Sequence, residues 1–283
     1  MKVGLGLPPG DPVSLLGWAR RAEAGPFSTL GLLDRIMYGN PEPMVTLAAI
    51  AGITSRIRVQ TEVLIAPLRA TALLAKQAAT LDRVSAGRFT LGVGVGARED
   101  DYRAVGVDVH SRGRRLDEQM AALRHLWEGG PYEDIGPIGP APVRRGGPEV
   151  LFGGFVPATV ERVVRWGDGL LGAHLPPERM GRFFGSVEAS WHAAGRAGRP
   201  RLVAQANAAL GPEPVLDEAR RSIGDYYGFL GDGASKVAEE MLTTPEAIRR
   251  AVAAYGDVGA DEVMLYCWSP DVDQVDRIAD AVP

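Results

Sequence analysis

Short apolar segments alternate with longer amphipathic segments from one end of the sequence to the other. The apolar segments resemble buried parallel strands, and the amphipathic ones have the three-to-four-residue spacing of helices that cover a sheet. The pattern predicts strands at residues 2–7, 28–33, 58–65, 88–95, 149–152, 169–173, 201–210 and 262–268. It predicts helices at residues 12–24, 43–54, 70–84, 112–127, 157–166, 177–195, 217–229, 245–258 and 272–281.

Strands and helices that alternate about eight times are typical of a (β/α)8 barrel. A doubly wound open sheet is the main alternative, but the series continues evenly without a change in composition, which favours the barrel. The 283 residues also suit a barrel, since roughly 250 residues are typical. We therefore expect an α/β fold, a TIM barrel, in a single domain that spans residues 1–283.

The segment LAKQAATLDRVSAGRFTLGVGVG, residues 74–96, contains a complete helix, turn and strand. Its strand ends in alternating glycines at Gly92, Gly94 and Gly96. Glycine lets a ligand or a neighbouring backbone approach where a side chain would block it. Because α/β proteins bind their ligands at the C-terminal ends of such strands, this end is a candidate for the site.

Composition narrows the possible partners. The 31 basic and 35 acidic residues give a net charge of −4, so there is no basic field for nucleic acid. The single cysteine, Cys267, excludes an internal disulfide framework and any cysteine-only metal site. The sequence begins directly with a predicted strand, and no apolar run reaches the ~20 residues of a membrane span. We expect a cytoplasmic protein with no membrane or nucleic-acid partner.

Two stretches break the regular pattern. Residues 129–147 are rich in glycine and proline and show no period, so we interpret them as a long surface loop over the barrel mouth. Residues 211–244 are expected to contribute the rest of the mouth.

The ends of the predicted strands are mostly small or apolar, which indicates that a bound cofactor supplies the reactivity. The pair Gly153-Gly154, with Phe155, Val156 and Thr159 after it, is a candidate phosphate cradle at a helix N-terminus. The alternative is a tight strand-to-helix turn in which Thr159 caps the helix.

Three polar residues near strand ends are candidates for chemistry. Asp34 either binds substrate, orients a cofactor or caps a turn. Glu62 lies in an apolar strand, so it is either inward-facing and functional or at a wet edge. His174 follows a strand end and is a candidate for the mouth. The four histidines have no ligand spacing, and we expect no metal.

Residues 74–96 closely resemble the signature of the luciferase-like monooxygenase family. Arg69, RGRRLDEQMAALRHLWEG (112–129), GGFVPATVERVVRWGDG (153–169) and TTPEAIRRAVAAYGDVGADEVMLY (243–266) resemble further family segments in the same order. The resemblance implies a (β/α)8 barrel that binds a flavin at its mouth, either reduced FMN used with oxygen or a deazaflavin coenzyme. It also implies a homodimer, and a separate flavin reductase if the flavin is held weakly.

The resemblance also implies which residues surround the flavin. It implies a bulge or non-proline cis peptide at Glu62-Val63, with Thr61 beside it, and a flavin phosphate at Gly153-Gly154 and residues 156–159. The flavin ring would be walled by Leu7, Val63, Gly94 and Trp268. The substrate would be oriented by Asp34, Glu62, Tyr102 or His174.

The sequence also departs from known members of the family. Deazaflavin-dependent sugar-phosphate dehydrogenases keep a histidine where this chain has Arg35 and a glutamate where it has Ala97. Bacterial luciferases keep an arginine where it has Val95 and a cysteine where it has Gly94. We therefore expect an FMN-using monooxygenase that acts on a small organic substrate. The alternatives are deazaflavin-dependent hydride transfer, a non-catalytic flavin-binding barrel subunit, and a barrel for another phosphorylated metabolite.

Overall fold

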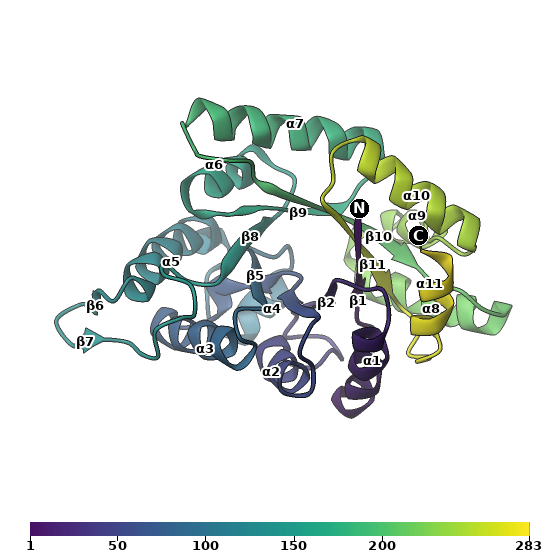
Figure 1. Cartoon of the computed structure of the whole chain (residues 1–283), viewed down its shortest axis with the longest axis horizontal. Coiled ribbons are helices and arrows are strands. Elements are labelled where there is room, and N and C mark those ends of the chain that lie inside the picture. The colour runs from purple at the N-terminus through teal and green to yellow at the C-terminus, as the bar shows by residue number, and fades with distance from the viewer. Residues whose placement is uncertain (283) are drawn as a thin grey trace.

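The computed structural model describes residues 1–282, and its strands close into a parallel barrel (Figure 1). Closure comes from β3, which pairs with β2 on one side and β5 on the other. The barrel strands are β1 (Lys2–Gly6), β2 (Thr29–Leu32), β3 (Arg58–Thr61), β4 (Leu64–Ile65), β5 (Phe89–Gly94), β8 (Glu149–Gly153), β9 (Gly169–His174), β10 (Arg201–Ala208) and β11 (Glu262–Cys267). When β3 and β4 are counted as one interrupted strand, residues 1–282 contain the eight barrel strands that the sequence predicts. The TIM-barrel prediction is therefore confirmed.

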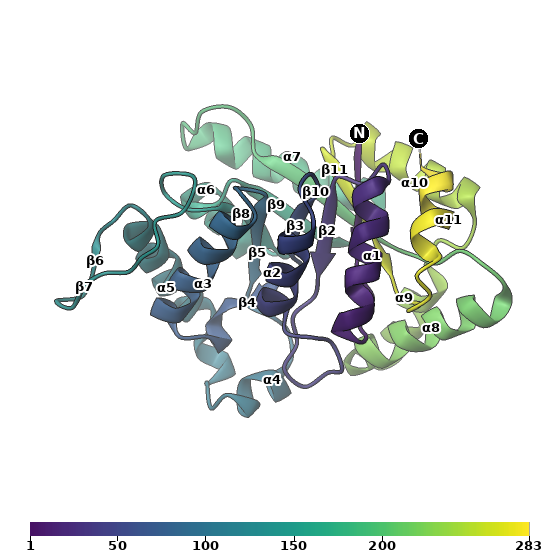
Figure 2. The same cartoon turned by 60° about the horizontal axis from the view of Figure 1, so that its bottom comes forward.

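Helices surround the barrel, and the two views of the molecule show them outside the strands (Figures 1 and 2). They are α1 (Pro12–Ala24), α2 (Pro43–Ile53), α3 (Thr71–Val84), α4 (Glu99–Ala104), α5 (Arg112–Trp127), α6 (Pro157–Trp166), α7 (Pro177–Ala193), α8 (Glu213–Tyr227), α9 (Gly233–Glu239), α10 (Pro245–Asp257) and α11 (Gln274–Ala281). Over residues 1–282, none of them is both long and apolar enough to cross a membrane.

The inside of the barrel is filled in layers, which leaves the C-terminal end for a site. At the N-terminal end Arg201 forms an ion pair with Glu149 at 2.5 Å and another with Glu262. The next layer is apolar and lies two residues further along each strand, at Leu151, Leu171, Val203 and Met264. Because successive strand residues alternate between the two faces, the residues between these layers pack outward against the helices.

The predicted strand 58–65 is interrupted. β3 ends at Thr61 and β4 begins at Leu64, and the peptide bond between Glu62 and Val63 is cis, as the family resemblance implied. The Thr61 hydroxyl donates to the Gly92 carbonyl at 2.7 Å. This contact joins the interrupted strand to its neighbour β5.

The prediction that residues 129–147 cover the mouth is wrong. This segment runs from the end of α5 to the start of β8, so both its ends lie at the N-terminal end of the barrel, and between them it runs along the outer side of α3 and α5. It contains the hairpin of β6 (Pro131–Tyr132) and β7 (Gly136–Pro137). The backbone N–H of Val143 donates to the Asp82 carboxylate near the end of α3, at 2.7 Å. A connection from a helix to the next strand always returns to this end of a barrel.

Residues 211–244 follow β10 and do lie on the mouth side, as expected. They form α8, a 3-10 turn at Gly228–Leu230 and α9 before the chain returns to the barrel. A bridge between Ala208 and Leu242 closes the insertion at its base. The short helices α4 and α9 were not predicted, because seven residues or fewer do not establish a helical period.

Candidate active site

Two glycines face the side chain of Val63 beside the interrupted third strand. A Cβ atom on Gly153 would lie 2.3 Å from Val63 Cγ1, and one on Gly94 would lie 2.9 Å from Val63 Cγ2. Side chains at either position would therefore collide with Val63. Val63 itself is half-buried and packs against the layer of interior side chains below it. Glycine at these two positions therefore lets Val63 pack directly against the ends of β5 and β8.

The turn from β8 to α6 has the features of an anion cradle. Gly154 has φ +140°, which favours glycine, and a Cβ there would lie 2.5 Å from the Thr159 hydroxyl. Phe155 and Val156 are 60% and 47% exposed, so the turn faces solvent. In the part of the chain that the structure describes, α6 has no side-chain cap and no acidic residue in its first turn. These free N–H groups and the helix dipole fit a phosphate.

Two arginines lie next to this turn. Arg179 and Arg182 of α7 line a groove of about 320 Å³ together with Phe155, Leu175, Phe183 and Ser186. The groove adds positive charge beside the start of α6 and therefore suits a ligand with more than one anionic group.

Glu62 lies in the barrel interior among amide side chains. Gln205 Nε2 donates to Glu62 Oε2 at 2.9 Å, and Gln60 contacts the other carboxyl oxygen. The Tyr266 hydroxyl donates to the Glu62 backbone carbonyl at 3.2 Å. A Cβ on Gly31 would lie 2.6 Å from Glu62 Cδ, so glycine makes the room for this carboxyl.

Burial raises the pKa of Glu62 to about 7, against the lowering effect of the hydrogen bonds from Gln205 and Gln60. Among residues 1–282, Gln60 Oε1 has no hydrogen-bond partner. The oxygen and nitrogen of a glutamine side chain are told apart only by their contacts, so the Gln60 amide can also be placed the other way round. Its oxygen then faces Glu62 and accepts a hydrogen bond from the protonated carboxyl. The surroundings of Glu62 therefore suit a carboxyl group that gains and loses a proton near neutral pH.

Asp34 is occupied by internal contacts. Both of its oxygens accept from Arg69, at 2.6 and 3.0 Å, and Oδ2 also accepts from the Ile65 backbone N–H at 2.8 Å. The Asp34 side chain is only 1% exposed. Although burial opposes it, Asp34 raises the pKa of Arg69. Asp34 thus fixes the segment after β4 at the edge of the mouth.

Arg35 lies in the next position and is also buried. Its Nε donates to Asp101 at 2.5 Å, and its guanidinium carbon lies 5.8 and 5.7 Å from the ring centres of Tyr38 and Tyr226. Arg35 thereby links the end of β2 to α4 and α8. Because an arginine stays charged, Arg35 cannot act as a general acid or base at this position.

Aromatic side chains close the mouth on the side of α8. Tyr226 and Tyr227 pack on Trp268 with ring centres 5.1 and 6.0 Å away. Trp268 Nε1 donates to Asn207 Oδ1 at 2.8 Å. These rings shield the space above Glu62 from water.

The other predicted site residues lie further apart. His174 Nε2 lies 3.2 Å from Glu240 of the α8–α9 insertion. Leu7 is fully buried in the core between barrel and helices. Tyr102 is 1% exposed in a separate cluster with Ile65 and Leu68, and its hydroxyl donates to the Val95 carbonyl. The structure therefore brings Glu62, Val63, Gly94 and Gly153 together and leaves Tyr102 and Leu7 in packing positions.

Sequence reasoning missed Gln60, Gln205 and the tyrosines of α8, whereas Asn207 was a candidate because it ends a predicted strand. The two glutamines are polar residues at inward positions of apolar strands, which is the same signal that pointed to Glu62. Over residues 1–282, no group of three or more His, Cys, Asp or Glu residues has the geometry to hold a metal ion.

The fold and the site together define a TIM-barrel protein with an uncapped helix N-terminus after β8 and a buried acid inside the barrel. Residues 3–272 match the model of the luciferase-like monooxygenase family, and the chain belongs to this family. The resemblance stated from the sequence is thereby confirmed.

Three proteins illustrate what this chain is similar to. An uncharacterised protein of Mycobacterium tuberculosis is 31% identical over 222 residues, which cover 76% of this chain and 73% of that protein. The oxygenase component of a flavin-dependent trigonelline monooxygenase of Acinetobacter baylyi is 24% identical over 74% of this chain and 66% of its own length. The solved structure of an F420-dependent secondary alcohol dehydrogenase with an F420–acetone adduct has a TM-score of 0.84. It is 18% identical, with 100% of this chain and 98% of that one covered.

Proposed function

We propose that this protein is an FMN-using monooxygenase that oxidises a small organic substrate with reduced flavin and oxygen. The observation that carries the proposal is the open N-terminus of α6 at the Gly153-Gly154 turn, which lies next to Val63 at the strand ends. In the proposal, a flat ring lies against the half-buried Val63, and the turn at Gly154 fits the phosphate attached to it. The similarity to a flavin-dependent monooxygenase supports the same reading.

In this proposal, Gly153, Gly154 and Thr159 hold the flavin phosphate, and Val63 and Gly94 hold the ring. Reduced FMN, when bound, supplies two electrons to oxygen, so that one oxygen atom enters the substrate and the other leaves as water. Glu62 holds or releases a proton inside the barrel, which its pKa of about 7 allows near neutral pH. Tyr226, Tyr227 and Trp268 exclude water from the reacting groups.

Deazaflavin-dependent hydride transfer is the second candidate, and the fold similarity to an F420-dependent dehydrogenase favours it. Against it stand Arg35 and Ala97, which replace the histidine and glutamate of the sugar-phosphate dehydrogenases. The groove lined by Arg179 and Arg182 is compatible with either cofactor, because both carry a phosphate.

A titration of the purified chain decides between the two. Quenching of flavin fluorescence by the chain with FMN but not with the deazaflavin coenzyme supports the monooxygenase. Oxygen uptake that depends on reduced FMN and on an added substrate would then identify the reaction. The opposite cofactor preference would overturn the proposal. Tight binding without turnover would indicate a non-catalytic flavin-binding subunit, and binding of neither cofactor a different phosphorylated ligand.

We further infer that the chain acts as a homodimer and receives reduced flavin from a separate reductase. α2 is apolar on all sides and has no charged residue between Pro43 and Ile53. Val45 and Ile53 on its outer face are 69% and 38% exposed. A second copy presents the same uncharged face, so the two can cover each other. Activity that depends on an added flavin reductase would support the second partner.

A further inference from the structure

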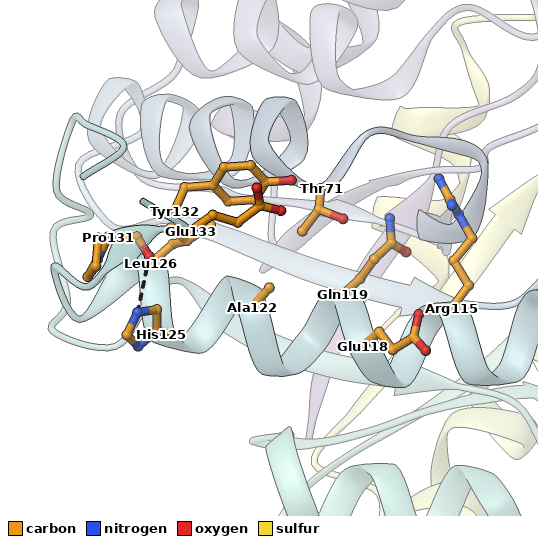
Figure 3. A pocket seen from close by; sticks show the side chains of 10 residues that line it. All are labelled: Thr71, Arg115, Glu118, Gln119, Ala122, His125, Leu126, Pro131, Tyr132 and Glu133. Carbon is orange, nitrogen blue, oxygen red and sulfur yellow. Dashed lines mark hydrogen bonds between the residues drawn. The ribbon is translucent and has the colours of Figure 1, made fainter. Parts of the chain in front are cut away.

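The groove beside the β8–α6 turn is lined by arginine and aromatic side chains and by no aspartate or glutamate. Its lining residues come from the turn and from α7 with the segment before it, and α7 packs beside α6 (Figure 1). A second cavity, between α5 and the β6–β7 hairpin, has Arg115 but also Glu118 and Glu133 in its wall (Figure 3). Of these two cavities, only the groove at α7 therefore has one sign of charge, which favours an anion.

The two arginines of the groove are available to a ligand. Arg179 and Arg182 lie three positions apart on α7, so they share one face of the helix, and both are exposed. Among residues 1–282, neither has a carboxylate oxygen within 4.0 Å, and neither donates a hydrogen bond to another residue. The neighbouring acid, Glu178, does not line the groove. Because guanidinium groups bind phosphate oxygens through paired N–H bonds, the two arginines suit a phosphate group.

Exposed aromatic surface lies beside the arginines. Phe155 is 60% exposed in the turn, and Phe183 of α7 is half-buried in the same groove. A flat heteroaromatic base stacks on such a ring, and a guanidinium stacks on the base in turn. The groove therefore combines a surface for a base with a site for a phosphate.

The groove begins at the turn that holds the flavin phosphate in the proposed function. Phe155 directly follows Gly153-Gly154 in the sequence and lines the groove. FMN has one phosphate, which the uncapped start of α6 can bind. FAD is FMN with an adenylate joined through that same phosphate, so it carries one more phosphate and one more flat ring. These two additions match the arginine pair and the exposed Phe155.

We propose that this groove binds the adenylate half of FAD. The inference rests on the proposed function and extends its cofactor from FMN to FAD. The flavin phosphate stays at the Gly154 turn, the second phosphate pairs with Arg179 and Arg182, and the adenine lies against Phe155. FAD therefore binds the chain more tightly than FMN does.

Calorimetric titration of the full chain with FMN, FAD and ADP-ribose tests this inference separately from the proposed function. FAD should bind at least about tenfold more tightly than FMN, and also at least about tenfold more tightly than ADP-ribose, which lacks the flavin ring. If FMN binds and FAD binds no more tightly, the inference is overturned and the proposed function stands. If neither flavin binds, both fail. ADP-ribose that binds as tightly as FAD would make the groove a site for a free nucleotide and would also overturn the inference.

Variants at α7 test the role of the arginine pair. Arg179→Gln/Arg182→Gln should weaken FAD binding at least about tenfold and FMN binding less than about threefold. Arg20→Gln/Arg250→Gln is the matched control, because it removes two exposed arginines of α1 and α10 that form no ion pair within residues 1–282. It should leave both affinities unchanged. The inference is contradicted if the α7 double variant binds FAD as well as the parent does, or if it loses FMN and FAD equally.

Discussion

Arg69 donates to both carboxylate oxygens of Asp34, at 2.6 and 3.0 Å, across the gap between the second and third strand positions of the barrel. Asp34 is almost completely buried, and its remaining contact is the Ile65 backbone N–H. This pair fixes the segment after β4 against the end of β2. Val63 lies just before that segment, so its position at the strand ends depends on the pair.

We predict that Arg69→Leu destabilises the chain by about 3–5 kcal/mol, because it leaves a buried carboxylate unpaired. The double variant Asp34→Leu/Arg69→Leu should lose less, since neither charge is then uncompensated. Urea denaturation of the parent, Arg69→Leu, Asp34→Leu and the double variant measures both effects. A double variant that loses the sum of the two single losses would show that the residues do not act as a pair.

Glu62 should make stability depend on pH. Its pKa is about 7 in the folded chain, compared with 4.5 for an unperturbed glutamate. Between these values the folded chain keeps a proton that the unfolded chain has lost, so stability falls as pH rises through this range. The loss is complete above pH 7 and amounts to about 3 kcal/mol.

Glu62→Gln should remove this pH dependence and leave the chain more stable than the parent above pH 7. Glu128→Gln, an exposed carboxyl on the outer surface, serves as the control and should leave the profile unchanged. Chemical denaturation at a series of pH values provides the measurement. A profile for Glu62→Gln that matches the parent's would mean that Glu62 titrates at its ordinary pKa.

Gly154→Asp should weaken FMN binding about a hundredfold or more, because it places a negative charge against the phosphate. Gly154→Asn has nearly the same shape and lacks the charge, so it isolates the effect of crowding against Thr159 and of φ +140°. Both variants should bind FMN less tightly than the parent does. Gly154→Asp should bind it about tenfold more weakly than Gly154→Asn. Unchanged affinity in Gly154→Asp would place the phosphate elsewhere.

Val45→Asp should convert the proposed homodimer into monomers, because it introduces a charge into the uncharged face of α2. Val13→Asp on α1 is the matched control, since Val13 is equally exposed, at 71%, but lies outside that face. Analytical ultracentrifugation at several concentrations distinguishes the two. A parent chain that sediments as a monomer throughout would exclude the homodimer.

The barrel was predictable because each strand and helix has its own local pattern. Helices and strands were found to within a few residues, and the cis peptide at Glu62-Val63 followed from the family resemblance. The error at residues 129–147 came from composition, which marks a loop but does not say at which end of the barrel it lies. Chain order does say so, because the segment follows a helix and precedes a strand.

The surroundings of Glu62 could not be read from the sequence in the same way. Gln60, Gln205 and Tyr266 are separated by up to 206 positions and meet only because the barrel closes. Tyr102 was expected to orient the substrate. The short helix α4 instead places its ring in a separate cluster with Ile65 and Leu68.

The hairpin of β6 and β7 offers a handle for attaching the protein to a surface. Cys267, the only cysteine of the sequence, is fully buried, whereas Ile135 between the two hairpin strands is 78% exposed. An Ile135→Cys variant would therefore present one reactive thiol to a maleimide reagent. Because this hairpin lies on the outer side of α3 and α5, molecules immobilised through it would share one orientation with the mouth left uncovered.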